Sequence, residues 1–389
     1  SRLFSWEKYG TSKVGFYLRF VPEIFTFPQQ YPTHDWFEQA RNGNIPHAQM
    51  VVCENGGLGW LAVQRYIQTI LCGSGGCGSC DVCRQHHLMV HPDVHYVFPV
   101  VGGSASVGTS DVYISEFRNY LTFNKFPLVR GWIDALDAAQ KVVQISVKEA
   151  KRMGDLLHLK SHSGGYKVML VWLPERMHES AANKLLKTLE EPEKNTVIIL
   201  LTHAEEEVLG TIRSRCQTLY LPPWGNAEVE KWLIGTRKMD SIQAKILASL
   251  SAGSPGIALD FLENRERLIP LAAHFVEWMR LAFKKDLPGL QVWVDGVGGW
   301  SREQQRDFLV FSGQLLSQLT RLRHNALRGF ALQWFPEVSF QPAGFAKLLT
   351  PRNILLLHKT LDDAFVDIGR NINPRLVFFD SSLLLMKAF

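Results

Sequence analysis

Two uninterrupted apolar segments constrain the fold of this chain more than any other feature. They are residues 166–173 (YKVMLVWL) and 196–201 (TVIILL). Continuous apolar runs of this length fit strands of a parallel sheet that is covered on both faces. Further strands are predicted at 49–53 and 217–221, and a helix with one apolar face at 180–191. This alternation predicts a doubly wound α/β domain that ends near residue 223.

The strand signals fade after Gly225, and the remainder of the chain is predicted to be mostly helical. Helices are expected at 227–234 and 241–250, and a turn at 251–256 precedes a further helix. At roughly 150 residues per domain, a chain of 389 residues corresponds to two or three domains. The predicted division is an N-terminal segment of unassigned role (1–34), an α/β domain (35–224), a small helical domain (225–268) and a larger helical domain (269–389).

Composition and hydropathy narrow the class of protein. No segment provides the run of about 20 apolar residues that crosses a bilayer. The first 20 residues lack the basic-then-apolar layout of a signal peptide. We therefore expect a cytoplasmic protein that does not associate with membranes. The formal net charge of +5 is compatible with nucleic-acid binding without demonstrating it.

Four cysteines lie within twelve residues and are interleaved with glycines that permit tight turns: Cys72, Cys77, Cys80 and Cys83. In the cytoplasm such a cluster is more often metal-binding or catalytic than disulfide-forming. Four thiolates complete the tetrahedral shell of zinc and leave no open position for a substrate. We predict a structural zinc site, and free or oxidised thiols are the alternative. The nearby histidines are expected to be surface or packing residues (His86, His87, His91 and His95).

The segment after the first predicted strand has the context of a phosphate-binding loop, but it lacks the chemistry. It is 54–61 (ENGGLGWL), whereas a working loop has the pattern G-x-x-x-x-G-K-[ST]. Gly57 and Gly59 remain. Glu54 replaces the first glycine of the pattern, Trp60 the lysine and Leu61 the hydroxyl. A carboxylate repels a triphosphate, and neither Trp nor Leu replaces the lost groups.

The acidic motif that accompanies a phosphate-binding loop in a nucleotide site is incomplete as well. The predicted strand at 166–173 is followed by Pro174 and Glu175, so a single carboxylate remains where acidic residues would organise magnesium and water. The alternative interpretation is that neither segment was ever a nucleotide site.

In this order, these features resemble the clamp-loader subunits of bacterial DNA polymerase III, within the AAA+ superfamily. The resemblance is carried by IPHAQ (45–49), the position of the cysteine cluster before HPD (91–93), GYKV (165–168), ERM (175–177), AANKLLKTLEEP (181–192) and IRSRC (212–216). It covers about residues 35–223 and continues more weakly through GSPG (253–256) and NINP (371–374). Motor subunits of the family keep an intact P-loop. This chain has a degenerate loop and a retained Ser-Arg-Cys motif. In this respect it is similar to the subunits of the family that do not hydrolyse ATP.

The resemblance implies an AAA+ base domain (35–224) with a zinc module inserted at about 72–95, a helical lid (225–268) and a helical collar (269–389). It implies a five-subunit ring whose other members are a motor subunit of the gamma/tau type and a delta-type subunit. The sliding clamp and primed DNA are the further implied partners. Such a chain binds no ATP and is not an enzyme alone. Gly256 takes the position where active relatives carry a sensor arginine.

Ser214, Arg215 and Cys216 form the functional motif that the resemblance implies. In the family this arginine projects into the ATP site of the neighbouring motor subunit, where a guanidinium supplied in trans stabilises charge on the transferred phosphoryl group. Arg213 is close enough to share or take this role. Lys184 and Lys187 are candidates for sequence-independent contacts with DNA phosphates, or they belong to a solvated helix face.

Two other functions are left open by the residues. One is a divergent but active ATPase motor, which Trp60 and Leu61 disfavour. The other is a zinc-containing AAA+-like DNA-binding protein that acts outside replication, which would require a concentrated basic face.

Overall fold

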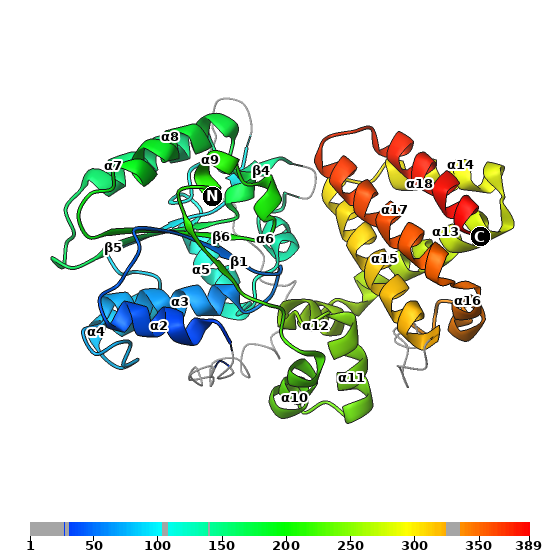
Figure 1. The fold of residues 1–389 in the computed structure, drawn as a ribbon, viewed down its shortest axis with the longest axis horizontal. Coiled ribbons are helices and arrows are strands. Elements are labelled where there is room, and N and C mark those ends of the chain that lie inside the picture. Colours follow the sequence, from blue (N-terminus) through cyan, green and yellow to red (C-terminus); the bar gives the residue numbers. More distant parts are fainter. Residues whose placement is uncertain (1–26, 28–30, 103–107, 139–140, 324–334) are drawn as a thin grey trace, which may run out of the picture.

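The structure is a computed structural model of the 389-residue chain, and it describes residues 27, 31–102, 108–138, 141–323 and 335–389. The predicted N-terminal segment 1–34 therefore lies almost entirely outside the described residues. Figure 1 shows an α/β domain beside a region built only from helices. Among the described residues, no helix combines the length and the apolar character needed to span a membrane.

The α/β domain is built on five parallel strands in the order β2-β5-β6-β1-β7. The strands are β1 (Ala48–Val52), β2 (Val94–Val97), β5 (Lys167–Trp172), β6 (Thr196–Thr202) and β7 (Gln217–Tyr220). The four predicted strands are confirmed, with ends displaced by one residue at most. The strand β2 is not predicted from the sequence, because it is short and contains a histidine.

Helices cover both faces of this sheet (Figure 1). Successive residues of β1 face opposite layers, since Met50 and Val51 belong to different apolar cores. One layer contains α2 (Thr33–Arg41), α3 (Gly59–Leu71), α5 (Ile114–Phe123) and α6 (Val129–Ala135). The other contains α7 (Val147–His158), α8 (Glu179–Glu190) and α9 (Gly210–Arg213). Burial on both faces explains why the strands are apolar without alternation.

Smaller elements complete the α/β domain. The short helix α4 (Asp81–His87) follows the cysteine segment, and β3 (Val100–Val101) pairs antiparallel with β4 (Val143–Gln144). The chain passes from β1 to α3 on one side of the sheet, and from β6 to α9 on the other. Open α/β sheets bind ligands at the carboxyl ends of adjacent strands whose following helices lie on opposite faces. The strands β1 and β6 are such a pair.

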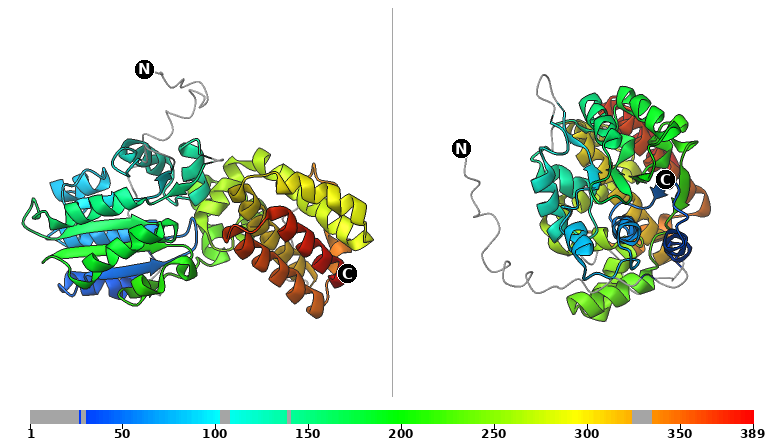
Figure 2. Two further views of the ribbon diagram at one scale, coloured as in Figure 1. Left: turned by 90° about the horizontal axis from the view of Figure 1, so that it is seen from above. Right: turned by 90° about the vertical axis from the view of Figure 1, so that its left-hand side faces the viewer.

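The second half of the chain is helical, and Figure 2 shows it extending away from the α/β domain with the C-terminus at its far end. Its helices are α10 (Asn226–Arg237), α11 (Ser241–Leu250), α12 (Pro255–Glu263), α13 (Arg265–Lys284), α14 (Leu287–Gly298), α15 (Arg302–Arg323), α16 (Pro342–Leu348), α17 (Pro351–Gly369) and α18 (Pro374–Ala388). Local sequence sets several of their starts. Asp240 caps α11 through the amides of Ile242 and Gln243, and Ser254 caps α12 just before its first-turn proline.

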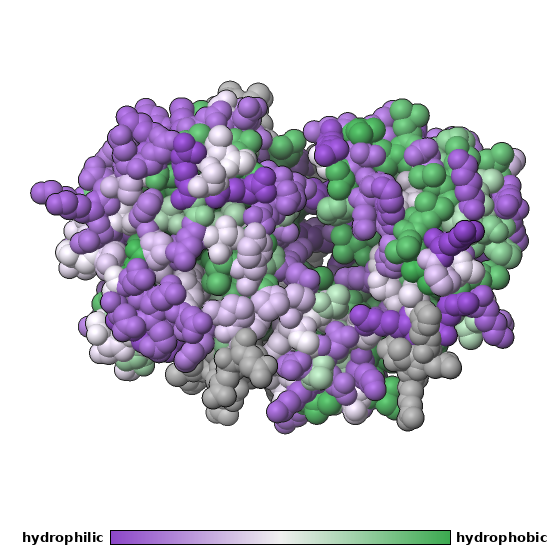
Figure 3. All heavy atoms as spheres, viewed as in Figure 1, coloured by the Kyte–Doolittle hydropathy of each residue, from purple (hydrophilic) through white to green (hydrophobic). Residues whose placement is uncertain are grey.

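The surfaces of the two regions differ in character. On the face drawn in Figure 3, the α/β domain is predominantly hydrophilic, whereas the helical region carries many more hydrophobic residues. Leu355 on α17 and Leu376 on α18 are each about two-thirds exposed or more, at 73% and 66%.

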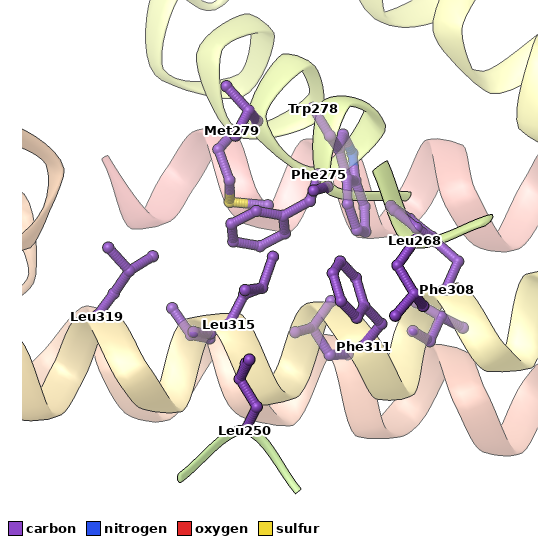
Figure 4. Close-up of a cluster of buried hydrophobic side chains, with 14 of the residues drawn as sticks. Leu250, Leu268, Phe275, Trp278, Met279, Phe308, Phe311, Leu315 and Leu319 are labelled. Carbon is purple, nitrogen blue, oxygen red and sulfur yellow. The ribbon is translucent and has the colours of Figure 1, made fainter. Parts of the chain in front are cut away.

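One apolar core runs through the helical region, from Val229 to Leu385. Figure 4 shows Leu250 of α11 pointing toward Leu315 of α15, with Phe275 of α13 on the opposite side. The core is therefore continuous across the predicted lid–collar boundary at 268. Deeper in this region the Trp278 indole donates a hydrogen bond of 2.8 Å to the Ser382 hydroxyl, which satisfies a fully buried donor.

Ion pairs join the α/β domain directly to α15 of the helical region. Arg176 lies 2.9 Å from Glu303, and Glu207 lies 3.1 Å from Arg306. Arg130 on α6 pairs with Asp307. Asp307 also lies 4.0 Å from Arg267 at the start of α13. These contacts bring together residues that are far apart in sequence, and no local pattern predicts them.

Candidate functional sites

The four cysteines of the predicted zinc site converge at the junction of α3 and α4. Their Sγ atoms all lie within 4.8 Å of one another. The contacts are 3.8 Å from Cys72 to Cys77, 3.8 Å from Cys72 to Cys80 and 4.0 Å from Cys77 to Cys83. A zinc tetrahedron with Zn–S bonds of about 2.3 Å has sulfur–sulfur edges of about 3.8 Å. The donor set and its dimensions therefore fit zinc.

The backbone around the cluster is shaped to hold these thiols. Gly75, Gly76 and Gly78 all have positive φ, which side chains rarely adopt. The Gly78 amide donates to Cys83 Sγ at 3.3 Å, and the Cys83 amide donates to Cys80 Sγ at 3.4 Å. Such N–H groups stabilise thiolates, and the amides of Ser79 and Cys80 lower the pKa of the Cys77 thiol to about 6.

No histidine joins the candidate metal ligands in the described part of the chain. His86 is buried, and its Nε2 lies 2.9 Å from the Gln64 carbonyl oxygen on α3. Arg65 on the same helix donates to the Gly76 carbonyl oxygen at 2.8 Å. Both contacts fasten the cysteine segment to α3, and His86 is a packing residue as predicted.

The glycine loop after β1 is closed by other parts of the chain. The Gly256 amide at the start of α12 donates to the Gly56 carbonyl oxygen at 2.8 Å. The Ser254 hydroxyl donates to the Asn55 carbonyl oxygen at 2.8 Å, and the Asn55 side chain accepts from the Val129 amide at 3.0 Å. These contacts hold the start of α6 and the start of α12 directly against the loop, and the loop atoms that they engage are oxygen acceptors of Asn55 and Gly56.

The closeness of Gly56 and Gly256 excludes any side chain at residue 256. A Cβ placed there would lie 2.5 Å from the Phe126 carbonyl oxygen and 2.8 Å from Gly56 Cα. Both neighbours are backbone atoms, which cannot swing aside. An arginine at this position is incompatible with the observed contact between loop and helix.

We expect Gly256→Ala to lower the free energy of unfolding by about 3 kcal/mol, because the overpacked methyl group meets backbone. Gly235→Ala provides the matched control, since Gly235 lies within α10 with open space around its Cα. There alanine should stabilise by up to about 1 kcal/mol. Urea unfolding of both variants measures the difference. If the two variants unfold with the same free energy, the contact between residue 256 and its backbone neighbours accommodates a methyl group, and the prediction is wrong.

Trp60 and Gly59, at the start of α3, serve the core of the domain. The Trp60 ring is buried, with ring centroids 5.7 Å from Phe117 and 6.2 Å from Trp172. A Cβ on Gly59 would lie 2.1 Å from Cys53 Sγ. This glycine is therefore needed for helix–strand packing. Leu61 packs partly buried against the same core. Glu54 lies at the surface.

A buried polar cluster fills the carboxyl ends of β1, β5 and β6. Glu175 accepts hydrogen bonds from the Thr202 hydroxyl at 2.8 Å and the His203 amide at 3.1 Å. The Trp172 indole donates to His203 Nε2 at 3.3 Å. That bond assigns the ring proton to Nδ1, which lies 3.0 Å from the Cys53 carbonyl oxygen.

This cluster does not activate Cys53 as a nucleophile. The thiol lies 3.6 Å from His203 Nδ1, the ring nitrogen that already carries a proton. Burial raises the pKa of Cys53 to about 12, so the thiol stays neutral. Cys53 is 7% exposed and packs in the core of the domain.

Burial also raises the pKa of Glu175 from an ordinary 4.5 to about 7. Because the folded-state pKa is raised, the chain should lose stability as the pH rises from about 4.5 through 7. The neutral Glu175→Gln variant should lack this loss and be more stable at pH 8 by on the order of 3 kcal/mol. Urea unfolding at pH 5.5 and pH 8 tests this. Parallel pH profiles for the two proteins would contradict it.

The Ser-Arg-Cys motif lies on the turn after α9, at the surface. Arg215 is held against the end of α8, where Glu190 Oε1 accepts from its Nε at 2.8 Å and lies 2.5 Å from its Nη2. Ser214 donates its hydroxyl to the Thr211 carbonyl oxygen at 3.1 Å. Cys216 packs partly buried beside α8, and burial raises its pKa to about 11. Of the three motif residues, Arg215 alone presents a charge.

The other predicted cations lie nearby. Arg213 pairs with Glu206 at 3.3 Å, away from Glu190. Lys184 and Lys187 are exposed on α8, the helix that ends at Glu190. The contact between Glu190 and Arg215 spans 25 residues, and no signal in the sequence pairs the two.

The sheet order, the glycine loop after β1 and the helical C-terminal region define an AAA+-type architecture. The chain belongs to the family described as DNA polymerase III, delta subunit, whose model matches residues 29–225. This confirms the clamp-loader resemblance of the sequence.

Curated relatives name the subunit more narrowly as delta-prime. DNA polymerase III subunit delta' of Escherichia coli is 32% identical over 234 residues, or 57% of each chain. That of Haemophilus influenzae is 24% identical over 252 residues, covering 62% of this chain and 65% of the relative. That of Bacillus subtilis is 28% identical over 212 residues, or 52% of each. The matched part thus spans half to two thirds of these relatives, and all three support the delta-prime class.

Proposed function

We propose that this chain acts as a non-hydrolysing delta-prime-type subunit of the DNA polymerase III clamp loader, and that it supplies Arg215 to the ATP site of a neighbouring motor subunit. The observation that carries the proposal is the closed loop after β1, combined with a surface arginine in the family's motif. The loop carbonyl of Gly56 is bonded to the Gly256 amide, whereas Arg215 stays at the surface. The chain would thus complete the nucleotide site of a neighbouring subunit without having a working nucleotide site itself.

The absence of a working nucleotide site follows from chemistry and space together. Phosphate binding needs free backbone N–H groups, a lysine and a hydroxyl that holds magnesium. Here the residues at the lysine and hydroxyl positions, Trp60 and Leu61, pack into the domain core. The loop itself is covered by α12 and α6.

Calorimetric titration of the isolated chain with Mg-ATP is expected to show no binding up to millimolar concentration, and hydrolysis should be absent. The double variant Trp60→Lys/Leu61→Thr should not restore binding, because the loop remains covered. The motor subunit serves as the positive control. Micromolar affinity with turnover by the isolated chain would refute the non-hydrolysing role.

The proposed contribution of Arg215 is electrostatic. Phosphoryl transfer spreads negative charge over the transferred group, and a planar guanidinium offers paired donors to two of its oxygens. Arginine is charged at every physiological pH, so its contribution needs no proton transfer. A side chain already held at the surface loses less freedom when it meets the neighbouring subunit.

Zinc is proposed at the four cysteines, as a structural ion. Cys72 ends α3 and Cys80 caps α4, so a metal bound to both would fix the turn between the two helices. Four thiolate ligands complete the coordination shell, which supports a structural and not a catalytic role.

The remaining partners are proposed from the surfaces. Exposed apolar side chains on α17 and α18 suit the collar contacts of a hetero-oligomeric ring with gamma/tau-type and delta-type subunits. Presentation of the opened sliding clamp to primed DNA is the task proposed for the whole ring. Lys184 and Lys187 would contribute only sequence-independent phosphate contacts.

A further inference from the structure

We propose that Glu190 is a positioning residue for Arg215. Its carboxylate, at the end of α8, binds the edge of the guanidinium formed by Nε and Nη2, so that the edge formed by Nη1 and Nη2 faces outward toward a phosphoryl group. This inference rests on the proposed function of Arg215 as a finger in trans. It adds a second residue of this chain to the neighbouring site.

The hydrogen bonds of Arg215 define which edge is free. Its Nε donates a hydrogen bond of 2.8 Å to Glu190 Oε1, and its Nη2 lies 2.5 Å from the same oxygen in an ion pair. Its Nη1 donates to the Thr211 carbonyl oxygen at 2.9 Å. A guanidinium has five N–H groups, and these contacts use three of them.

Beyond these contacts, Nη1 also donates a long hydrogen bond of 3.5 Å to the Ser214 hydroxyl, and Nη2 keeps one N–H group that does not face Glu190. Two N–H groups on adjacent nitrogens form a fork that matches two oxygens of a phosphoryl group. Glu190 therefore contacts Nε and Nη2 and leaves the Nη1–Nη2 edge to the phosphoryl group, which would replace only the long bond to Ser214.

Glu190 is placed on a rigid support. It is the last residue of α8, and Leu185 and Leu189 of that helix are buried in the core beneath. Arg215, by contrast, follows the four-residue helix α9 on a turn. The carboxylate, together with the negative end of α8, anchors a long side chain that would otherwise sample many rotamers.

The pair contributes little to the stability of the fold. The Arg215 and Glu190 side chains are 36% and 48% exposed, and ion pairs at such exposure are weak in water. Variants of Glu190 should therefore fold normally. The effect of these variants on turnover distinguishes two roles of Glu190. If Glu190 positions Arg215, its removal lowers turnover, whereas if Glu190 sequesters Arg215, its removal raises turnover.

The test uses the ring reconstituted with motor subunits, clamp and primed DNA, and it measures kcat and KM for ATP. Glu190→Ala should lower kcat about tenfold and leave KM within about twofold, because a misplaced group loses transition-state contacts. Glu190→Gln keeps an acceptor oxygen and should retain an intermediate rate. Glu191→Gln, at the adjacent exposed carboxylate, should match the unaltered ring. Combining Glu190→Ala with Arg215→Ala should add nothing to the loss from Arg215→Ala alone.

The outcomes separate the two proposals. If Arg215→Ala leaves turnover unchanged, the finger function itself is wrong, whatever Glu190 does. If Arg215→Ala lowers kcat but Glu190→Ala has no effect or raises it, the finger stands and the positioning role is overturned. A loss of assembled ring by size-exclusion chromatography, with normal kcat per ring, would also overturn it and make Glu190 an assembly residue.

Discussion

Arg215→Ala is expected to lower the clamp- and DNA-stimulated ATPase rate of the reconstituted ring by about tenfold or more, with the ring still assembled. Arginine fingers in related phosphoryl-transfer systems contribute on the order of 10³ to 10⁵ in rate. The smaller figure is expected because one finger completes only one of several sites in the ring. The loss should appear in kcat, since the contact forms in the transition state.

Two further variants make this result specific. Arg213→Ala removes a neighbouring charge that pairs with Glu206, and it should leave turnover within about twofold if Arg215 alone is the finger. Arg215→Lys keeps the charge but loses the planar fork, so it should recover little of the rate. Unchanged turnover in Arg215→Ala rings would make the motif structural and would favour a scaffold role. A loss confined to Arg213→Ala would transfer the finger to that residue.

Cys83→Ser is expected to abolish stoichiometric zinc binding and to lower the melting temperature of the chain by on the order of 10 °C. Cys83 is the most buried of the four ligands, at 1% exposed, and its sulfur accepts the Gly78 amide. Without the metal, three thiols remain on a turn rich in positive-φ glycines, which costs conformational entropy to order. Elemental analysis and scanning calorimetry measure the two effects.

Cys216→Ser is the matched control, because this cysteine lies outside the cluster. It should leave zinc content unchanged and cost about 1 kcal/mol for the lost packing. Chelation of the unaltered chain should reproduce the instability of Cys83→Ser. A metal-free chain that melts at the temperature of the purified protein would instead support the alternative of free thiols.

Much of the α/β domain could be predicted from local sequence. The runs at 166–173 and 196–201 are apolar throughout because their strands are buried on both faces. The helix at 180–191 has buried residues at helical spacing, and the structure places it at Glu179–Glu190. The strand β2 escaped prediction because four residues containing a histidine carry too little periodicity.

The residue types that make up the candidate sites could also be recognised from short stretches of sequence. Four cysteines within one turn-rich segment predicted their own convergence, because short glycine-containing spacings leave few other arrangements. The replacements at Trp60 and Leu61 predicted a defective phosphate loop from residue chemistry alone. Arg215 was found through a short family motif and lies at the surface, and its role as a finger stays a prediction.

The sequence by itself thus determined four of the five strands of the sheet, the four clustered cysteines, the altered loop residues and the candidate finger, because each depends on neighbours in the chain. The tertiary structure alone decided what surrounds them. It placed Ser254 on Asn55 across 199 residues, and it placed Glu190 beside Arg215. Such contacts depend on the packing of whole elements, which local periodicity and residue chemistry do not encode.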